Sequence, residues 1–249
     1  MFHVEQPMKA VQMGVVDSPL AVAGICRENG LLLTDVQMGL LAEFVGRLLV
    51  WNKKINLISR RDEGNVWFSH VLHSVAPLFY VNIPEKISIL DLGSGGGFPG
   101  IPLAIVRPDL KLTLLDSVRK KTMVTADIVG AIKLPNIVIQ TARAEELAQS
   151  MGGKFDMVVA RAVASLADLV RWSKPLIRRK GKVPFDQTSV PLGRHPSPSL
   201  LALKGGDLEG EIQEVRVKVR PAQIETVAMN FSGCEELGLE DKKLVLVTL

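Results

Sequence analysis

Apolar residues recur at the spacing of helical turns in two stretches near the start of the chain. The first stripe consists of Leu41, Phe44, Val45 and Leu48, and the second of Phe68, Val71, Leu72 and Val75. Residues spaced i, i+3, i+4 and i+7 share one helix face, so each stripe predicts a helix with one buried side. Thr34 and Gln37 have the spacing of a capping box, which predicts that the first helix begins near residue 34.

After residue 82 the pattern changes to short apolar runs that alternate with helical stretches. The runs are Ile87–Leu92, Leu112–Leu115, Ile137–Gln140, Phe155–Ala160 and Leu200–Leu203. The helical stretches between them are Ile101–Val106, Val118–Ile132, Ala144–Ser150 and Leu166–Ile177. Strands that alternate with helices form right-handed crossover units, so we expect a mostly parallel sheet with helices on both faces. Two further runs, Ile224–Met229 and Leu244–Leu249, are expected to close the sheet as an antiparallel pair.

Two segments follow neither pattern. Residues 1–30 lack a clear period and carry few charges, so we expect a loosely ordered extension there. Lys180–Ser199 is rich in proline, and a connection of this length within a compact domain is typical of a functional or disordered loop. We therefore expect a mobile surface loop over 180–199. The rest of 31–249 is expected to form one domain, a helical lead-in over 31–82 and a Rossmann-like α/β core with a seven-stranded sheet over 83–249.

The composition narrows the class of protein. The chain of 249 residues is 47% hydrophobic with a low net charge, which excludes a largely disordered chain. Its two cysteines, Cys26 and Cys234, exclude a disulfide scaffold and a Cys-based structural zinc site. No window of about 18 uncharged apolar residues is present, so no membrane span is expected. We expect a cytoplasmic protein without a metal or a membrane partner, and we expect it to be a monomer.

The net charge of +4 is mild, but the basic residues are clustered. The clusters are Lys53-Lys54, Arg60-Arg61, Arg119-Lys120-Lys121 and Arg178-Arg179-Lys180. A single cluster is most simply a solvated surface, whereas the four together indicate a polyanionic partner such as a nucleic acid.

A glycine-rich turn follows the first predicted strand, with the sequence DLGSGGGFPG from Asp91 to Gly100. Glycine lets the backbone turn tightly and approach a ligand closely. The glycines that we expect at the ligand are Gly93, Gly95 and Gly97. A pyrophosphate needs N–H donors at the helix start, but Pro99 and Pro102 remove donors there and Asp91 adds a negative charge. The turn therefore favours S-adenosylmethionine, which carries an ammonium group and a sulfonium.

Further candidate residues follow the later strands. Asp116 ends the second strand, where an acid can accept hydrogen bonds from ribose hydroxyls. Ala144 and Glu145 follow the third strand, and their backbone groups could meet the edge of an adenine. Glu145 equally suits the first turn of a helix, where an acid favours the helix dipole. Arg161 ends the fourth strand, where its guanidinium can bind a carboxylate or a phosphate.

Several motifs, taken in order, resemble those of one enzyme family. They are Asn52-x-x-x-Asn56-Leu57, DLGSGGGFPGIPLA from Asp91, LLDS from Leu114, RAEE from Arg143, ARAVA from Ala160 and LKGG from Leu203. From about residue 33 to its C-terminus, the chain resembles the bacterial small-subunit ribosomal RNA guanine-N7 methyltransferases, also called GidB or RsmG proteins. The Gly-Phe-Pro-Gly-Ile-Pro run is specific, because most methyltransferases lack prolines there. One departure is His73, which precedes Ser74 where the family usually has an acid.

The resemblance implies a class I methyltransferase fold and an S-adenosylmethionine-dependent enzyme. Its substrate would be the N7 of one guanine in small-subunit (16S) ribosomal RNA, either free or in the small ribosomal subunit. By motif position, the resemblance implies cofactor contacts from Gly93, Phe98, Ala144, Glu145 and Arg161. It also implies an RNA-facing edge near Asn52, Asn56, His70 and Lys204. Guanine N7 carries a lone pair and no proton, so we assign no general base and expect catalysis mainly by orientation.

Two alternatives remain open at this point. A small-molecule methyltransferase with the same cofactor fold would have a closed substrate pocket and would be indifferent to salt. An inactive, methyltransferase-like module would only hold RNA. The intact Asp91, Asp116 and turn glycines argue against the inactive module.

Overall fold

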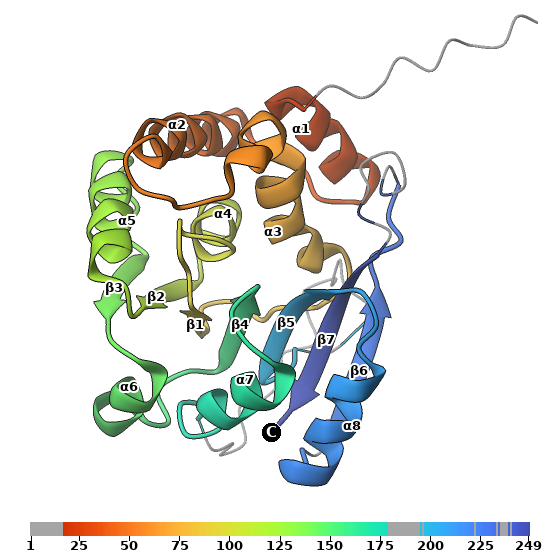
Figure 1. Cartoon of the computed structure of the whole chain (residues 1–249). Helices are drawn as coiled ribbons and strands as arrows, with labels where there is room; N and C mark the ends of the chain where they lie inside the picture. Colours follow the sequence, from red (N-terminus) through yellow and green to blue (C-terminus); the bar gives the residue numbers. More distant parts are fainter. Residues whose placement is uncertain are drawn as a thin grey trace, which may run out of the picture.

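A seven-stranded sheet with the strand order β3-β2-β1-β4-β5-β7-β6 runs through the middle of the protein (Figure 1). The computed structural model describes residues 17–178, 195, 197–221, 223–232, 234, 239 and 241–249. The strands are β1 (Ser88–Leu92), β2 (Lys111–Asp116), β3 (Ile137–Thr141), β4 (Met157–Arg161), β5 (Leu200–Gly205), β6 (Gln223–Ala228) and β7 (Lys242–Thr248). Strands β1 to β5 pair in parallel, whereas β7 runs antiparallel to both β5 and β6. The predicted sheet and its closing antiparallel pair are confirmed.

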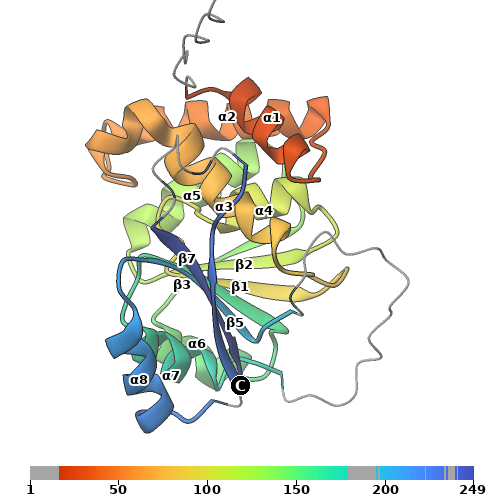
Figure 2. The same ribbon diagram turned by 90° about the vertical axis from the view of Figure 1, so that its right-hand side faces the viewer.

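Helices cover both faces of the sheet, so that the molecule has three layers (Figure 2). One face carries α1 (Pro19–Glu28), α2 (Asp35–Asn52), α4 (Gly100–Val106) and α5 (Arg119–Ala131). The other face carries α6 (Ala144–Met151), α7 (Leu166–Ser173) and α8 (Glu209–Lys218). Because successive strand side chains point to opposite faces, β1 buries Ile89 in the first layer and Leu90 in the second. The two hydrophobic clusters fix the strand ends from which the pocket residues project.

The helical lead-in follows the predicted boundaries, with one change of geometry. Helix α2 begins with the predicted capping box, in which the Thr34 N–H donates to Gln37 Oε1 at 2.9 Å. The second predicted helix is a continuous run of different turns, namely η1 (Arg60–Asn65), a π-helical η2 (Trp67–Leu72), α3 (His73–Val75) and η3 (Ala76–Phe79). A π-turn is rare and often occurs at functional sites. Here it presents His70 toward the pocket described below.

The expected loose extension is wrong for residues 17–30, which contain helix α1. Val22, Ile25 and Cys26 lie at helical spacing and are buried in the core. Ser18 caps the helix by accepting the Ala21 N–H, and a proline occupies the first helical position, where its missing N–H costs nothing. These signals are present in the sequence but span too few residues to form a clear stripe. Residues 1–16 lie outside the described part of the chain.

Two further differences concern the second half of the chain. Helix α8 was not expected, because its sequence is polar and Val215 is the one residue of the helix that is buried. The predicted mobile loop over 180–199 lies outside the described residues except for 195 and 197–199. The division of the chain into an extension, a lead-in and a core stays a prediction.

Candidate active site

A cavity of about 440 Å³ opens at the carboxyl ends of β1, β2 and β4. This edge is where parallel α/β sheets bind their ligands. Of the residues predicted to bind the cofactor, those that line the cavity are Gly93, Gly95, Phe98, Asp116, Ala144, Glu145 and Arg161. Asp91 and Gly97 do not line it. The predicted cofactor residues thus supply seven of the 21 residues that line the cavity.

Asp91 lies beneath the glycine-rich turn and is completely buried. Its Oδ2 accepts the Gly100 N–H at 2.8 Å, while Oδ1 has no hydrogen-bond partner among the described residues. Burial raises the pKa of Asp91 to about 7, although the Gly100 N–H and the Arg161 charge lower it. Asp91 therefore supports the start of α4 from below, and its predicted contact with the cofactor stays a prediction.

The glycine-rich turn depends on backbone angles that only glycine adopts easily. Gly93, Gly95 and Gly97 have φ values of 75°, 53° and 95°. A Cβ on Gly93 would lie 2.6 Å from a methyl group of Val163, and a Cβ on Gly97 would lie 2.5 Å from the Ile101 side chain. The absence of a side chain at Gly93 thus lets the turn pack against the loop after β4. The absence of a side chain at Gly97 lets the turn pack against α4.

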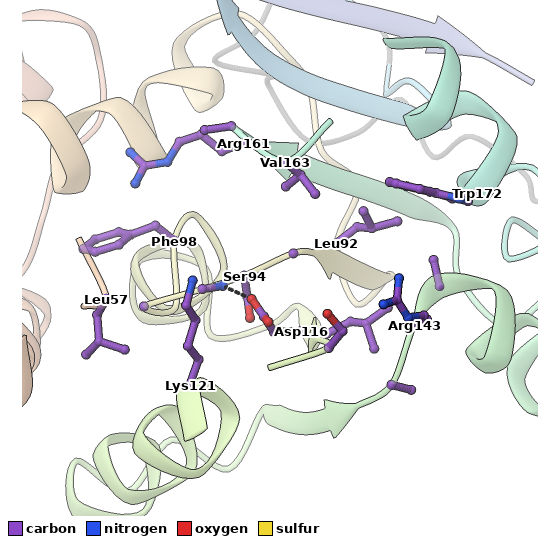
Figure 3. Close-up of a pocket in the computed structure, with 18 of the residues that line it drawn as sticks. Leu57, Leu92, Ser94, Phe98, Asp116, Lys121, Arg143, Arg161, Val163 and Trp172 are labelled. Carbon is purple, nitrogen blue, oxygen red and sulfur yellow. Dashed lines mark hydrogen bonds between the residues drawn. The ribbon is translucent and has the colours of Figure 1, made fainter. Parts of the chain in front are cut away.

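The amide groups of the turn are already used inside the protein. The N–H groups of Gly93 and Ser94 donate to the Leu115 carbonyl at 2.8 and 2.9 Å. The Gly95 N–H donates to Asp116 Oδ2 at 2.9 Å (Figure 3), and the Val118 N–H donates to Oδ1 at 2.8 Å. An ionised carboxylate has about four acceptor sites, so Asp116 can still accept hydrogen bonds from the cavity. The turn presents an acceptor to a ligand, not a set of free donors.

A stack of charged and aromatic side chains closes one end of the cavity. The Arg161 guanidinium carbon lies 5.0 Å from the centre of the Phe98 ring, and the His70 ring centre lies 5.0 Å from the same ring. Arg161 Nη2 also contacts His70 Nδ1, and Nη1 donates to the Ser69 carbonyl at 3.1 Å. Burial lowers the pKa of Arg161 to about 10, so its guanidinium stays charged at neutral pH. This end of the cavity therefore suits an anionic group such as a carboxylate.

Four of the lining residues that were not predicted as site residues stand out by their side chains. Lys121, on the first turns of α5, and Arg161 enter the cavity from opposite sides (Figure 3). Trp172 of α7, Arg143 before α6 and Val163 of the loop after β4 complete the wall (Figure 3). Lys121 belongs to a basic cluster that the sequence assigned to a polyanionic partner and not to the cofactor cavity. Trp172 lies two turns into a helix, so no strand-end signal could have marked it.

The residues predicted to face RNA differ in their surroundings. Asn52 is buried, and its Oδ1 accepts the N–H groups of Leu57 and Ile58 at 2.7 and 3.0 Å. Lys204 donates to the Ala164 carbonyl at 2.9 Å and to Glu211 at 2.8 Å. Asn56 is exposed, in the loop next to the cavity. The Asn52 side chain therefore shapes the loop, and its predicted contact with RNA stays a prediction.

His73 departs from the acid expected by resemblance, and the structure buries it. Its Nε2 has no hydrogen-bond partner among the described residues. Burial, followed by the positive charges of Arg161 and Lys242, lowers the pKa of His73 to about 3. His73 is therefore neutral at physiological pH and leaves the nearby Arg161 without a negatively charged neighbour at this position.

Exposed basic side chains flank lining residues of the cavity along the chain, and we call this set the rim. The rim consists of Lys53, Lys54, Arg60, Arg61, Arg119 and Lys120. Arg143 and Lys121 line the cavity itself. Of the fourth predicted cluster, only Arg178 is described, and it pairs with Asp156 at 2.6 Å. The rim has the charge expected for contact with a polyanion.

Within the described residues, no three or more His, Cys, Asp or Glu side chains gather in a way that could hold a metal ion. No helix in the described part of the chain is long and apolar enough to cross a membrane.

Comparisons with known proteins agree with this geometry. A family model described as rRNA small subunit methyltransferase G matches residues 37–239. Two curated relatives of that name, from Bacteroides fragilis and Bacteroides thetaiotaomicron, are each 40% identical to this chain. Their matches cover 87% and 86% of this chain and 95% and 93% of the relatives.

Two solved structures are similar in fold, each with a TM-score of 0.50. One is a fibrillarin/Nop5p complex, 9% identical, which covers 73% of this chain and 81% of the matched chain. The other is described as a predicted O-methyltransferase from Agrobacterium tumefaciens, 15% identical, with 70% and 79% covered. At such identities the likeness concerns the fold alone, and it confirms the predicted class I methyltransferase architecture.

Proposed function

The chain belongs to the rRNA small subunit methyltransferase G family, and on that premise we propose how its cavity serves the reaction. Membership makes the chain an S-adenosylmethionine-dependent methyltransferase that acts on small-subunit (16S) ribosomal RNA. Our proposal is that the cavity binds S-adenosylmethionine and that the methyl group is transferred to the N7 of one guanine.

The hydrogen bonding of the glycine-rich turn carries this proposal. A dinucleotide cofactor needs free backbone donors for its pyrophosphate, but the N–H groups of Gly93, Ser94 and Gly95 are already bound within the protein. Asp116 instead offers a carboxylate to the cavity, which suits the hydroxyls of a ribose. The residues therefore fit a phosphate-free nucleoside cofactor.

Three parts of the cavity would hold such a cofactor. Asp116 would accept hydrogen bonds from the ribose, and Arg161 would bind the carboxylate of the methionine portion. Ala144 and Glu145, at the start of α6, would meet the adenine, with Trp172 on the same side of the cavity. When bound, S-adenosylmethionine supplies a methyl group carried on a positively charged sulfur.

For methyl transfer, the protein needs to hold the guanine in one orientation. It does not need to move a proton. Guanine N7 has a free lone pair, so no side chain has to act as a base. His70 would be a poor base in any case, because burial and the Arg161 charge lower its pKa to about 4. Holding two reactants in alignment can by itself supply about 7–11 kcal/mol of the barrier reduction. The rim of basic side chains would hold the RNA backbone while the target base enters.

The test is methyl transfer from labelled S-adenosylmethionine to small ribosomal subunits that lack the modification, beside a reaction with total small metabolites. We expect label in the RNA at one guanine, and we expect strand cleavage there after reduction and aniline treatment, which is the signature of N7 methylation. Asp116→Ala should abolish the label, whereas Glu43→Gln, which removes an acid from an exposed ion pair on α2, should not.

Other outcomes point to the alternatives. Label found only among metabolites would contradict the RNA substrate and favour a small-molecule methyltransferase. RNA binding without any label, together with no cofactor binding by calorimetry, would favour an inactive RNA-binding module. Label in RNA at a position other than a guanine N7 would leave the family in place and overturn the proposed target atom.

A further inference from the structure

We propose that His70 and Lys204 are positioning residues that hold the two ends of the loop between β4 and α7, and that neither presents its polar atoms to RNA. The loop consists of residues 162–165, directly after Arg161 at the end of β4. The proposal rests on the proposed function, because the loop lines the cavity in which methyl transfer is placed. It assigns one chain of polar side-chain contacts to each end of the loop, and we call each chain a strut.

The first strut runs from Asp62 through His70 to Arg161. Asp62 Oδ2 lies 3.2 Å from His70 Nε2, and His70 Nδ1 contacts Arg161 Nη2. Because a guanidinium can only donate, Nδ1 must be the acceptor. The imidazole is therefore neutral with its proton on Nε2, which donates to Asp62. A half-exposed carboxylate on η1 is thus linked through the ring to the guanidinium of Arg161, directly before the loop.

The second strut runs from Glu211 through Lys204 to the other end of the loop. Lys204 Nζ donates to the Ala164 carbonyl at 2.9 Å and to Glu211 Oε2 at 2.8 Å. The same Glu211 oxygen accepts the Leu166 N–H, the first amide of α7, at 2.7 Å. One carboxylate on α8 therefore fixes both the lysine and the helix start that follows the loop.

The loop between these struts has a conformation that requires support. Ala162 has a φ of 52°, which is a left-handed angle that residues with a side chain adopt only when their surroundings impose it. Val163 packs so closely on the glycine-rich turn that a Cβ on Gly93 would overlap its methyl groups. A small shift of the loop would therefore change the cavity wall and the turn together.

The polar atoms of both residues are already occupied. Both ring nitrogens of His70 have partners within the protein, and its side chain is 11% exposed. Lys204 uses its ammonium group on two internal acceptors, and its side chain is 14% exposed. A phosphate that bound His70 or Lys204 would have to break these contacts. A phosphate that bound the exposed side chains of Arg60 or Lys120 would not have to break them. The geometry thus separates RNA contact, at the rim, from loop positioning, at the struts.

The second strut is tested by Glu211→Ala and Lys204→Met in the full-length protein, assayed on small ribosomal subunits that lack the modification. We expect each variant to lower kcat by about ten- to a hundred-fold, because displacing the reacting groups by about 1 Å has effects of that size. The KM for RNA and the salt dependence of RNA binding should stay as in the wild type. The double variant should be no slower than the slower single variant, since both changes break one unit.

Glu214→Gln is the matched control, because it removes an acid from an exposed ion pair with Lys218 on the same helix, α8. It should leave kcat and KM unchanged. The proposal is overturned if Lys204→Met weakens RNA binding and lowers its salt slope by about 1, as loss of a phosphate contact does. It is equally overturned if Glu211→Ala tightens RNA binding, because an acid at an RNA interface repels phosphate.

The first strut is tested without any RNA, by calorimetric binding of S-adenosylhomocysteine. Asp62→Ala and His70→Phe should each weaken binding by about five-fold, the value of one typical net hydrogen bond. Unchanged affinity in both variants, with a raised KM for RNA in His70→Phe, would overturn the assignment. Because Asp62 is half-exposed, Asp62→Ala tests the strut even if His70→Phe does not fold.

Amide hydrogen exchange separates this proposal from the proposed function. Residues 162–166 should exchange faster in Glu211→Ala and Lys204→Met, while the amides of β1 and β2 keep their protection. Unchanged exchange at 162–166 would overturn the struts. This measurement needs neither methyl transfer nor RNA, so it decides the role of the struts even if the substrate proves to be different.

Discussion

The carboxylate of Asp91 and the backbone of Gly100 fit together so closely that neither position tolerates an added atom. The Gly100 N–H donates to Asp91 Oδ2 at 2.8 Å, and a Cβ on Gly100 would lie 2.6 Å from that same oxygen. Asp91 ends up below the turn and not in the cavity. The acid of this motif therefore anchors the first helix after the turn, whereas Asp116 is the acid that lines the cavity.

Gly100→Ala should destabilise the protein. Its Cβ would also lie 2.8 Å from Leu114 Cδ1, and overpacking a buried site costs about 1–3 kcal/mol. The matched control is Gly46→Ala in the middle of α2, where a Cβ meets nothing within 4 Å. That change should stabilise the protein by about 0.5–1 kcal/mol through helix propensity. Denaturant unfolding of both variants measures the difference, and equal midpoints would contradict the assigned contact.

Gly93→Ala should abolish cofactor binding while the sheet remains folded. The added Cβ would lie 2.6 and 2.7 Å from the two methyl groups of Val163, and the residue has a φ of 75°. Adding Val163→Ala removes the steric overlap but not the cost of the backbone angle. The double variant should therefore recover binding only in part, as measured by calorimetry with S-adenosylhomocysteine. Full recovery would show that the overlap alone matters, and no recovery would show that the angle dominates.

Asn52→Ala and Asn56→Ala separate a structural asparagine from an exposed one. Asn52 Oδ1 holds the N–H groups of Leu57 and Ile58, and each buried donor left without a partner costs about 1–3 kcal/mol. Asn52→Ala should therefore lower the free energy of unfolding, and it should weaken cofactor binding because both amides belong to the cavity wall. Asn56→Ala should leave stability unchanged, so any effect it has must appear in the KM for RNA. Thermal melts and steady-state kinetics on both variants decide between these roles.

The sequence predicts the sheet and the glycine-rich side of the cavity because both depend on short-range patterns. Apolar runs of strand length, a glycine-rich turn and an acid at the end of β2 each mark their own position. Helix α8 cannot be predicted in this way, because its one buried residue does not form a helical pattern of apolar positions. Its Glu211 nevertheless holds the loop after β4, a contact between residues 45 positions apart that no local pattern records.

The same limit applies to residues whose side chains bond within the protein. Asn52 and Lys204 are polar residues in motifs shared with RNA methyltransferases, and a motif alone does not say which way a side chain points. The fold turns the Asn52 amide toward its own loop and the Lys204 ammonium toward Glu211. Asp91 was expected at the cofactor for a similar reason, because a strand-end acid can face either the ligand or the helix below it.

Two buried groups should make stability depend on pH in opposite directions. Burial raises the pKa of Asp91 from 3.8 to about 7, so the folded state keeps a proton that the unfolded state has released. Stability from this group is therefore full below about pH 4 and is lost as the pH rises to about 7. Burial lowers the pKa of His73 from 6.5 to about 3, so the unfolded state binds a proton that the folded state does not. Stability from His73 is full above about pH 6.5 and is lost as the pH falls toward 3.

His73→Leu isolates the second of these effects. The variant removes a buried Nε2 that has no partner among the described residues, so at pH 7 its stability should equal or exceed that of the wild type. Its advantage should then grow as the pH falls from 6.5 to 4, by up to about 1.4 kcal/mol per pH unit. Asp91→Asn should show the reverse, gaining on the wild type as the pH rises from 4 to 7. Denaturant unfolding of the three proteins at several pH values tests both slopes, and parallel curves would show that neither group titrates differently in the folded and unfolded states.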